Sequence, residues 1–136
     1  MMGPAEAFAR LDELKAVHGH AWTLSTELTG REQRRRWIAE RAGQSGAQTV
    51  RAKTVDELAE ALRFHTALDL VRESHGDVWE VSCELRDEGV PRWAWAHRRT
   101  RISRPGAWNV VRAPSPEGLG ERMAEAALRE RPDSVV

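Results

Sequence analysis

The stretch HGHAWTLSTEL, residues 18–28, returns 57 positions later as HGDVWEVSCEL, residues 75–85. Six of the eleven residues are identical and occur in the same order. The agreement continues at an offset of 61, where VRAKTVDELAEAL from Val50 matches VRAPSPEGLGERM from Val111. Between these blocks RRRWIAER aligns with PRWAWAHRR, so that Trp37 falls opposite Trp93. Ordered identity of this kind predicts an internal duplication.

Each copy has the pattern of three strands. In residues 22–28 and 79–85, apolar side chains alternate with polar ones, which is the two-residue period of a half-buried strand. Turn-like residues such as TGREQ and RDEGVP separate these segments from the next ones. The expected strands are residues 22–28, 34–41, 48–53, 79–85, 92–101 and 108–112.

A helix start follows the third strand of each copy. Thr54 and Glu57 have the spacing of a capping box. Ser115 precedes Pro116, which suits the first position of a helix because its missing N–H has no partner there. The expected helices are residues 5–17, residues 55–75 and a third from Pro116 onward.

The fold class that follows is α+β, an internal duplication of a βββα unit in the order α-βββ-α-βββ-α. We expect antiparallel strands, in one sheet or two, with helices on one face and the repeats related by a pseudo-twofold axis. Residues 1–136 would form a single compact domain of two repeats, about 5–62 and 63–131, which share the central helix 55–75.

The strand phases predict the side chains that lie beneath the helices. Cys83 continues the apolar phase of its strand and is expected to pack in the core. His18 and His75 each end a helix before a glycine, and we interpret both as helix ends at which glycine takes the left-handed conformation, not as metal ligands. The expected apolar face consists of Trp22, Leu24, Leu28, Trp37, Val50, Trp79, Val81, Leu85, Trp93, Trp95 and Val111.

The charges are sorted along a chain whose formal net charge is zero. Residues 18–53 carry a net charge of +4 and residues 78–114 a net charge of +3, whereas the three helical stretches are all net negative. A basic open sheet face would attract an anionic partner. Alternatively, strand arginines could pair with Glu27 and Glu84 across the sheet and only stabilise it.

The leading functional hypothesis is a small binding protein that recognises nucleic acid through an arginine-bearing sheet face. The alternative is a protein–protein adaptor or inhibitor that binds an acidic protein surface. A more remote alternative is an enzyme with Glu27 and Glu84 in one cleft. The expected partner-binding residues are Arg34, Arg36, Arg51, Arg98, Trp108 and Arg112, with Ser25, Glu27, Ser82 and Glu84 as a second group.

Two families share parts of this pattern. VRAKTVDELAEAL is similar to the strand-to-helix junction of double-stranded-RNA-binding domains, although that family places lysines where this chain has Asp56 and Glu57. The βββα unit resembles the arm-type DNA-binding domain of phage integrases, which lays a three-stranded sheet in the major groove. Each resemblance covers about half of the chain, and the second implies that the strand arginines contact DNA.

Other classes of function lack support in the sequence. Common catalytic and nucleotide-binding motifs are absent, and the histidines do not have metal-ligand spacing, so we expect no metal and no cofactor. The single cysteine excludes an internal disulfide and favours a reducing compartment. No apolar run is long enough to span a membrane, and the N-terminus lacks the pattern of a secretory signal, so the expected location is cytoplasmic.

Overall fold

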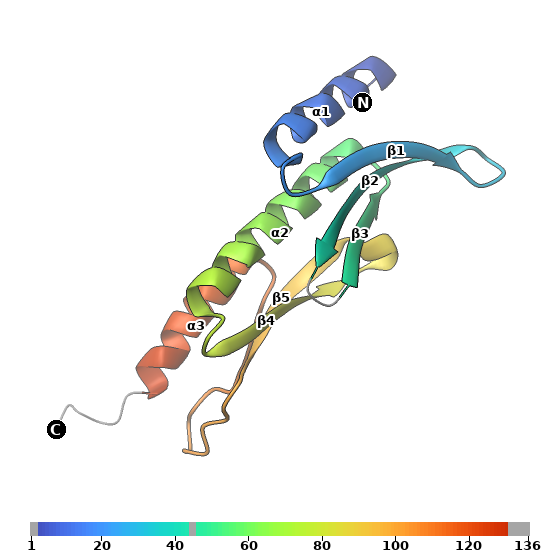
Figure 1. Ribbon diagram of the computed structural model, residues 1–136. Helices are drawn as coiled ribbons and strands as arrows, with labels where there is room; N and C mark the ends of the chain where they lie inside the picture. Colours follow the sequence, from blue (N-terminus) through green and yellow to red (C-terminus); the bar gives the residue numbers. More distant parts are fainter. Residues whose placement is uncertain (1–2, 44–45, 131–136) are drawn as a thin grey trace. The chain divides into compact units, whose positions relative to one another are not determined.

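A computed structural model describes residues 3–43 and 46–130 (Figure 1). The fold is α+β, with three helices and two antiparallel sheets of three strands in this part of the chain. The elements are α1 (Pro4–His18), β1 (Thr23–Thr29), β2 (Arg34–Gly43), β3 (Gly46–Ala52), α2 (Val55–His75), β4 (Trp79–Leu85), the short 3-10 turn η1 (Asp87–Gly89), β5 (Pro91–Arg98), β6 (Val110–Ala113) and α3 (Pro116–Glu130).

The chain divides into two compact units, which we call the first and the second unit. The first unit comprises Met1–Arg63 together with Arg86–Val90, and the second comprises Phe64–Leu85 together with Pro91–Val136. The sheet of the first unit has the order β1-β2-β3, and the sheet of the second has the order β4-β5-β6. The strands therefore form two sheets. The sequence pattern did not distinguish this arrangement from a single sheet.

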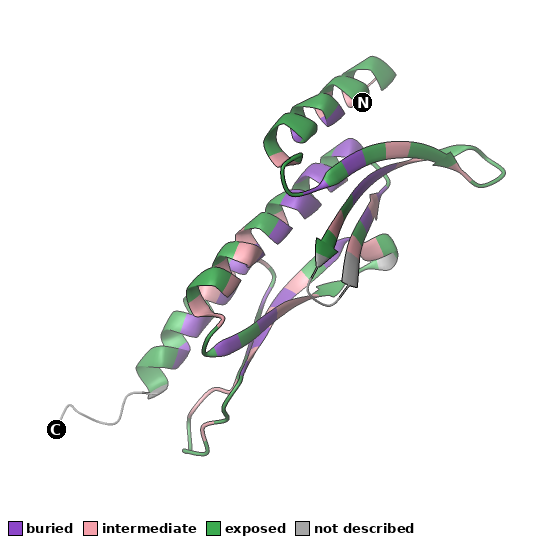
Figure 2. Ribbon diagram, in the orientation of Figure 1, coloured by how far each residue is buried: buried purple, intermediate pink, exposed green. Residues whose placement is uncertain are grey.

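The core of the first unit lies between one face of its sheet and the helices α1 and α2. Apolar residues recur along α2 at helical spacing, and Leu58 and Leu62 are fully buried there. Trp22, Trp37 and Val50 lie in the same cluster from the sheet side. In Figure 2 buried segments recur along α2. The opposite face of the sheet carries Ile38 and Arg51, of which Ile38 is only 3% exposed.

The turn between β4 and β5 is built into the first unit. Val90 is buried in its core cluster, and Glu88 binds Arg36 at 2.8 Å. Gly89 has φ +83°, and a Cβ there would lie 2.2 Å from the carbonyl oxygen of Thr49. Only glycine permits this backbone conformation together with so close an approach to β3.

The core of the second unit combines α3 with the end of α2. Leu68 of α2 and Leu119 and Met123 of α3 cover one face of the sheet. From β4 and β6, Trp79 and Val111 meet them. Cys83 packs against this cluster, as its position on the apolar phase predicts.

The phase predicted for β5 is wrong. Ala94 and Ala96 are fully buried on the helix side, whereas Trp93 and Trp95 lie half-buried on the other face. The register explains the result, because it places Ala96 beside Val81 on one neighbour and Val111 on the other, both of which belong to the core. Helix α3 packs against this strand, and the small alanine side chains fit beneath it in a closely packed core.

Two further core predictions are wrong. Leu28 is 49% exposed and Leu85 is 55% exposed, although both continue the apolar alternation of their strands. Each lies near the far end of its strand, beyond the residues that form the core cluster. Alternation therefore gave the correct phase in β1 and β4 but overestimated how far the helices cover them.

The helix starts have the predicted capping interactions. The Thr54 hydroxyl accepts the Glu57 N–H at 3.0 Å, and the Glu57 carboxylate accepts the Lys53 N–H at 3.1 Å. At the start of α3 the Ser115 hydroxyl accepts the Gly118 N–H at 3.1 Å. Such caps satisfy donors that the first turn of a helix leaves without a partner.

The predicted left-handed glycine after α1 is wrong in detail. Gly19 has φ −62°, which is the right-handed helical region. Its N–H donates to the carbonyl of Lys15 at 2.9 Å, and a Cβ at Gly19 would lie 2.4 Å from that same oxygen. Gly76 has the equivalent contact with Arg72. Close packing on a carbonyl, not a positive φ, therefore explains the glycine that follows each histidine.

Candidate functional site

The arginines predicted on the open face of the first sheet are engaged by nearby carboxylates. Arg51 binds Glu27, which lies two strands away, across β2. Arg36 binds Glu88 and keeps only 15% of its side chain exposed. Arg34 donates to Glu32 at 2.7 Å, and the second-group residue Ser25 is exposed on β1. These arginines lie on the face of the sheet that the strand phase predicts, but the carboxylates bound to them neutralise most of their positive charge.

Arg98 does not belong to an open surface, contrary to the prediction. It is 7% exposed and shares the phase of Ala94 and Ala96. Its guanidinium lies 4.4 Å from the Trp79 ring, and its Nε donates to the Trp108 carbonyl at 2.7 Å. Burying a guanidinium requires such partners, so Arg98 has a structural role within the second unit.

The predicted exposed position of Trp108 is also wrong. The residue precedes β6, packs against the core cluster of the second unit and is half-buried. The guanidinium of Arg129 lies 4.3 Å from its ring. Trp108 therefore joins the loop before β6 to α3 and does not present a free indole.

The open face of the second sheet is aromatic. The register places Trp93 opposite Glu84, Trp95 opposite Ser82 and His97 opposite Glu80. On the other side of β5, Arg112 lies opposite Trp95 and Val110 lies opposite His97. We call these side chains the aromatic face, which consists of Glu80, Ser82, Glu84, Trp93, Trp95, His97, Val110 and Arg112.

Neighbouring side chains hold the rings of the aromatic face in place. Trp95 and His97 are stacked, with centroids 5.4 Å apart and planes inclined by 15°. His97 Nε2 lies 2.9 Å from a Glu80 carboxylate oxygen. This chain of contacts leaves Trp95 with few alternative rotamers, so its half-buried ring is ordered before any partner binds.

Arg112 lies beside the middle of the aromatic face, opposite Trp95. Its guanidinium donates to Glu84 at 3.2 Å and lies 5.4 Å from the Trp93 ring. Val110 is 62% exposed beside these groups. The face therefore presents two indoles and Val110 among two polar pairs, and its two carboxylates outnumber its one arginine.

A basic loop joins β5 to β6 at one end of the aromatic face. We call residues 99–107 the arginine loop, because it carries Arg99, Arg101 and Arg104. Beyond its end, the Asn109 side chain accepts the Ile102 N–H at 2.8 Å and donates to the Ile102 carbonyl at 3.0 Å. The Arg99 side chain also donates to the Gly76 carbonyl at 2.6 Å. The loop thus presents positive charge from a backbone that is tied down.

The arrangement gives little support to acid–base or metal chemistry. Glu27 and Glu84, the pair proposed for a catalytic cleft, are each bound to an arginine of their own sheet. Within residues 3–43 and 46–130 no cluster of three or more metal-ligating side chains occurs. None of the helices in the same residues is long and apolar enough to cross a membrane.

Sequence reasoning missed Trp93, Trp95 and His97 as residues of the open face. A usable signal was present in the offset of 57, which also matches Ala39 with Ala96 and Arg41 with Arg98. Continuing that offset through the middle strand places the indoles of β5 on the open face. The alignment of Trp37 with Trp93 differs from this offset by one residue. Because a shift of one residue exchanges the two faces of a strand, this alignment assigned the indoles of β5 to the core.

Comparison with protein-family models, with curated proteins and with solved structures found no significant match.

Proposed function

We propose that this chain is a protein-interaction module that binds a protein partner through the aromatic face of its second sheet. The observation that carries the proposal is the pair Trp93 and Trp95 on the open side of β5, next to the exposed Val110. Tryptophan and arginine are the residues most enriched among energetically dominant contacts of protein interfaces. An indole that is ordered beforehand also loses little conformational entropy when a partner covers it.

The charge of the aromatic face favours a protein over a nucleic acid. Glu80 and Glu84 lie on the same face as Arg112, and a phosphate that approached the arginine would meet the Glu84 carboxylate. Nucleic-acid binding depends on cations that are free to neutralise phosphates. The separation of basic and acidic segments in the sequence favours recognition of nucleic acid, and that function remains a prediction. Fewer contacts of the aromatic face support it than support binding of a protein.

The arginine loop suggests the chemistry of the partner. Arg99, Arg101 and Arg104 add positive charge beside a surface that carries two indoles, one arginine and two carboxylates, each carboxylate paired within that surface. The complementary partner is a protein segment with an apolar anchor and acidic residues next to it. Arginine suits this role because its planar fork can bind a carboxylate through two hydrogen bonds.

Site-specific photocrosslinking tests the proposal. The photoreactive amino acid p-benzoylphenylalanine is placed at position 110, in the aromatic face, and in a matched control at position 70 of α2. Val110 and Leu70 are 62% and 60% exposed, so the two probes are equally accessible. After irradiation in cells that express the chain, adducts are identified by mass spectrometry with and without nuclease treatment.

A nuclease-resistant protein adduct that forms from position 110 and not from position 70 is the expected result. An adduct that nuclease removes would overturn the proposal in favour of nucleic-acid recognition. Equal yields from both positions would show that the aromatic face is not a preferred contact surface.

We also infer that the two units arose by duplication of one βββα segment. Both contain an arginine over the ring of a tryptophan at the start of, or just before, their first strand. The Arg41 guanidinium lies 4.3 Å from the Trp22 ring, and the Arg98 guanidinium lies 4.4 Å from the Trp79 ring. The ion pair of Glu27 with Arg51 likewise has a counterpart in Glu84 with Arg112. An experimental structure should superpose the strands with Ala39 on Ala96, and strands that fail to overlay in this register would contradict the inference.

A further inference from the structure

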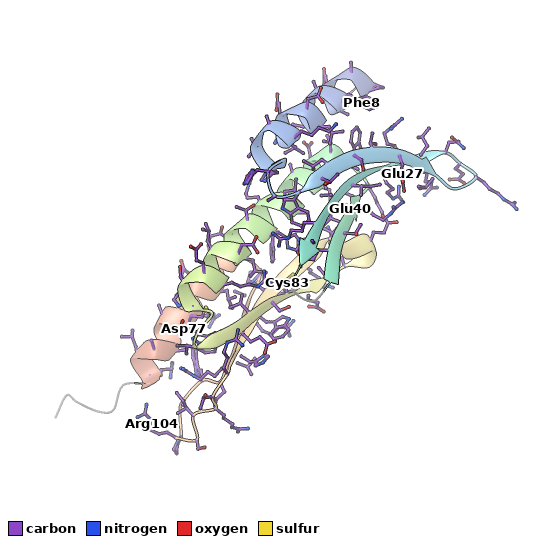
Figure 3. All side chains as sticks on the ribbon, in the orientation of Figure 1. Phe8, Glu27, Glu40, Asp77, Cys83 and Arg104 are labelled. Atoms are coloured by element: carbon purple, nitrogen blue, oxygen red, sulfur yellow. The ribbon has the colours of Figure 1, made fainter. Side chains whose placement is uncertain are left out.

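The first unit contains a cavity that is separate from the aromatic face. Its volume is about 390 Å³, which lies in the usual range for small-molecule sites. The N-terminal half of α1, strand β2 and the junction of β3 with α2 line it. All of the lining residues belong to the first unit. Figure 3 labels Phe8, one of the lining residues, on α1.

The apolar wall of the cavity is made by two aromatic rings. Phe8 and Trp37 lie 5.5 Å apart in an edge-to-face arrangement. Trp37 is buried, but Phe8 remains 42% exposed although it packs on Trp37. A ligand ring that entered the cavity would remove this apolar surface from water, which is the main favourable term in binding such a ligand.

The polar wall carries an excess of positive charge. The Arg35 guanidinium lies 5.0 Å from the Phe8 ring and uses one N–H to bind the Thr26 hydroxyl at 3.1 Å. Lys53 lines the same cavity, and Asp56 supplies the one carboxylate of the lining. Two cations against one anion leave a net charge of +1. The cavity thus suits a ligand with a single negative charge.

We propose that this cavity binds a small amphipathic monoanion, an aromatic carboxylate or sulfonate. Its ring system contacts Phe8 and Trp37, and its acid group binds Arg35 and Lys53. Arg35 can make charge-assisted hydrogen bonds with its remaining N–H groups, and these are about twice as strong as neutral ones. The site is independent of the aromatic face, so its test leaves the proposed function unaffected.

A pair of matched fluorescent probes tests the proposal. 1-Anilinonaphthalene-8-sulfonate carries the negative charge, and N-phenyl-1-naphthylamine has the same ring system without it. The variants are Arg35→Gln and Lys53→Gln, and Lys15→Gln is the control because Lys15 is exposed on α1 outside the cavity lining. Near-ultraviolet circular dichroism establishes that each variant is folded, since the anionic probe also binds loosely packed states.

The wild type and Lys15→Gln should bind the sulfonate saturably at one site per chain. Arg35→Gln and Lys53→Gln should each weaken that binding by about tenfold, the effect of losing one charge-assisted hydrogen bond. Binding of the neutral probe should change little in either variant. Sulfonate affinity that is the same in folded Lys53→Gln and Lys15→Gln, or binding that does not saturate, would overturn the proposal.

Discussion

At the scale of single residues, the environment of an arginine decides its role more than its position in the sequence does. Arg98 and Arg112 lie on neighbouring strands of one sheet, and the sequence grouped them as equivalent binding residues. Arg98 is 7% exposed against the Trp79 ring, whereas the Arg112 side chain is 57% exposed beside Glu84. The two arginines therefore lie on opposite faces of the sheet, Arg98 on the core side and Arg112 on the surface side.

This difference predicts unequal effects on stability. Arg98→Ala removes a cation–π contact and a buried hydrogen bond from a charged donor, and should lower the free energy of unfolding by about 2–4 kcal/mol. Arg112→Ala breaks an exposed ion pair and should cost about 0–1 kcal/mol. Urea denaturation of the two variants and the wild type measures both values. Equal losses would contradict the buried position of Arg98.

His18 gives a prediction about pH. Burial, and to a smaller extent the nearby charge of His20, lowers the pKa of His18 from its ordinary value of 6.5. The unfolded chain therefore binds a proton more readily than the folded chain, and stability should fall as the pH drops below about 6.5. His18→Gln should reduce this decline, as measured by urea midpoints at neutral and mildly acidic pH. A decline as steep as that of the wild type would show that other groups cause it.

At the scale of elements, the sequence predicts where strands and helices lie better than which face of a strand is covered. The expected helix 55–75 coincides with α2, because its cap and its apolar spacing are local signals. In β5, tryptophans alternate with alanines, and both are compatible with a core. Hydrophobicity alone favoured the indoles, but the space beneath the helices accommodates the alanines. That choice depends on packing between distant segments, which local patterns do not record.

The phase of β5 can be tested by exchanging residue sizes. Ala96→Leu should lower the free energy of unfolding by about 1–3 kcal/mol, because added methylenes overpack a filled core. Trp95→Leu should cost less, since Trp95 is only half-buried on the open face. Thermal or urea unfolding of the two variants provides the comparison. A tolerated Ala96→Leu together with a severely destabilising Trp95→Leu would mean that the phase is the reverse of that described.

At the scale of the whole molecule, the sorted charges and the repeated phrases were the clearest signals in the sequence. Their functional meaning depended on contacts that composition does not reveal. Arg36 binds Glu88, although 52 positions separate them, and this pairing could not be inferred from either local segment. The candidate surface consequently moved from strand arginines to the aromatic face. The arginine loop retains the positive charge that the sequence associated with partner binding.

The most direct test of partner binding by the aromatic face compares two surface variants. Trp95→Ala removes the ordered indole of this face, and Arg51→Ala breaks an ion pair on the other sheet as a matched control. Proteins that co-purify with the wild type and with each folded variant are quantified by mass spectrometry. We expect a partner that Arg51→Ala retains and that Trp95→Ala depletes by about tenfold or more, as for a dominant interface tryptophan. Equal recovery of every partner with Trp95→Ala and with the wild type would contradict the account.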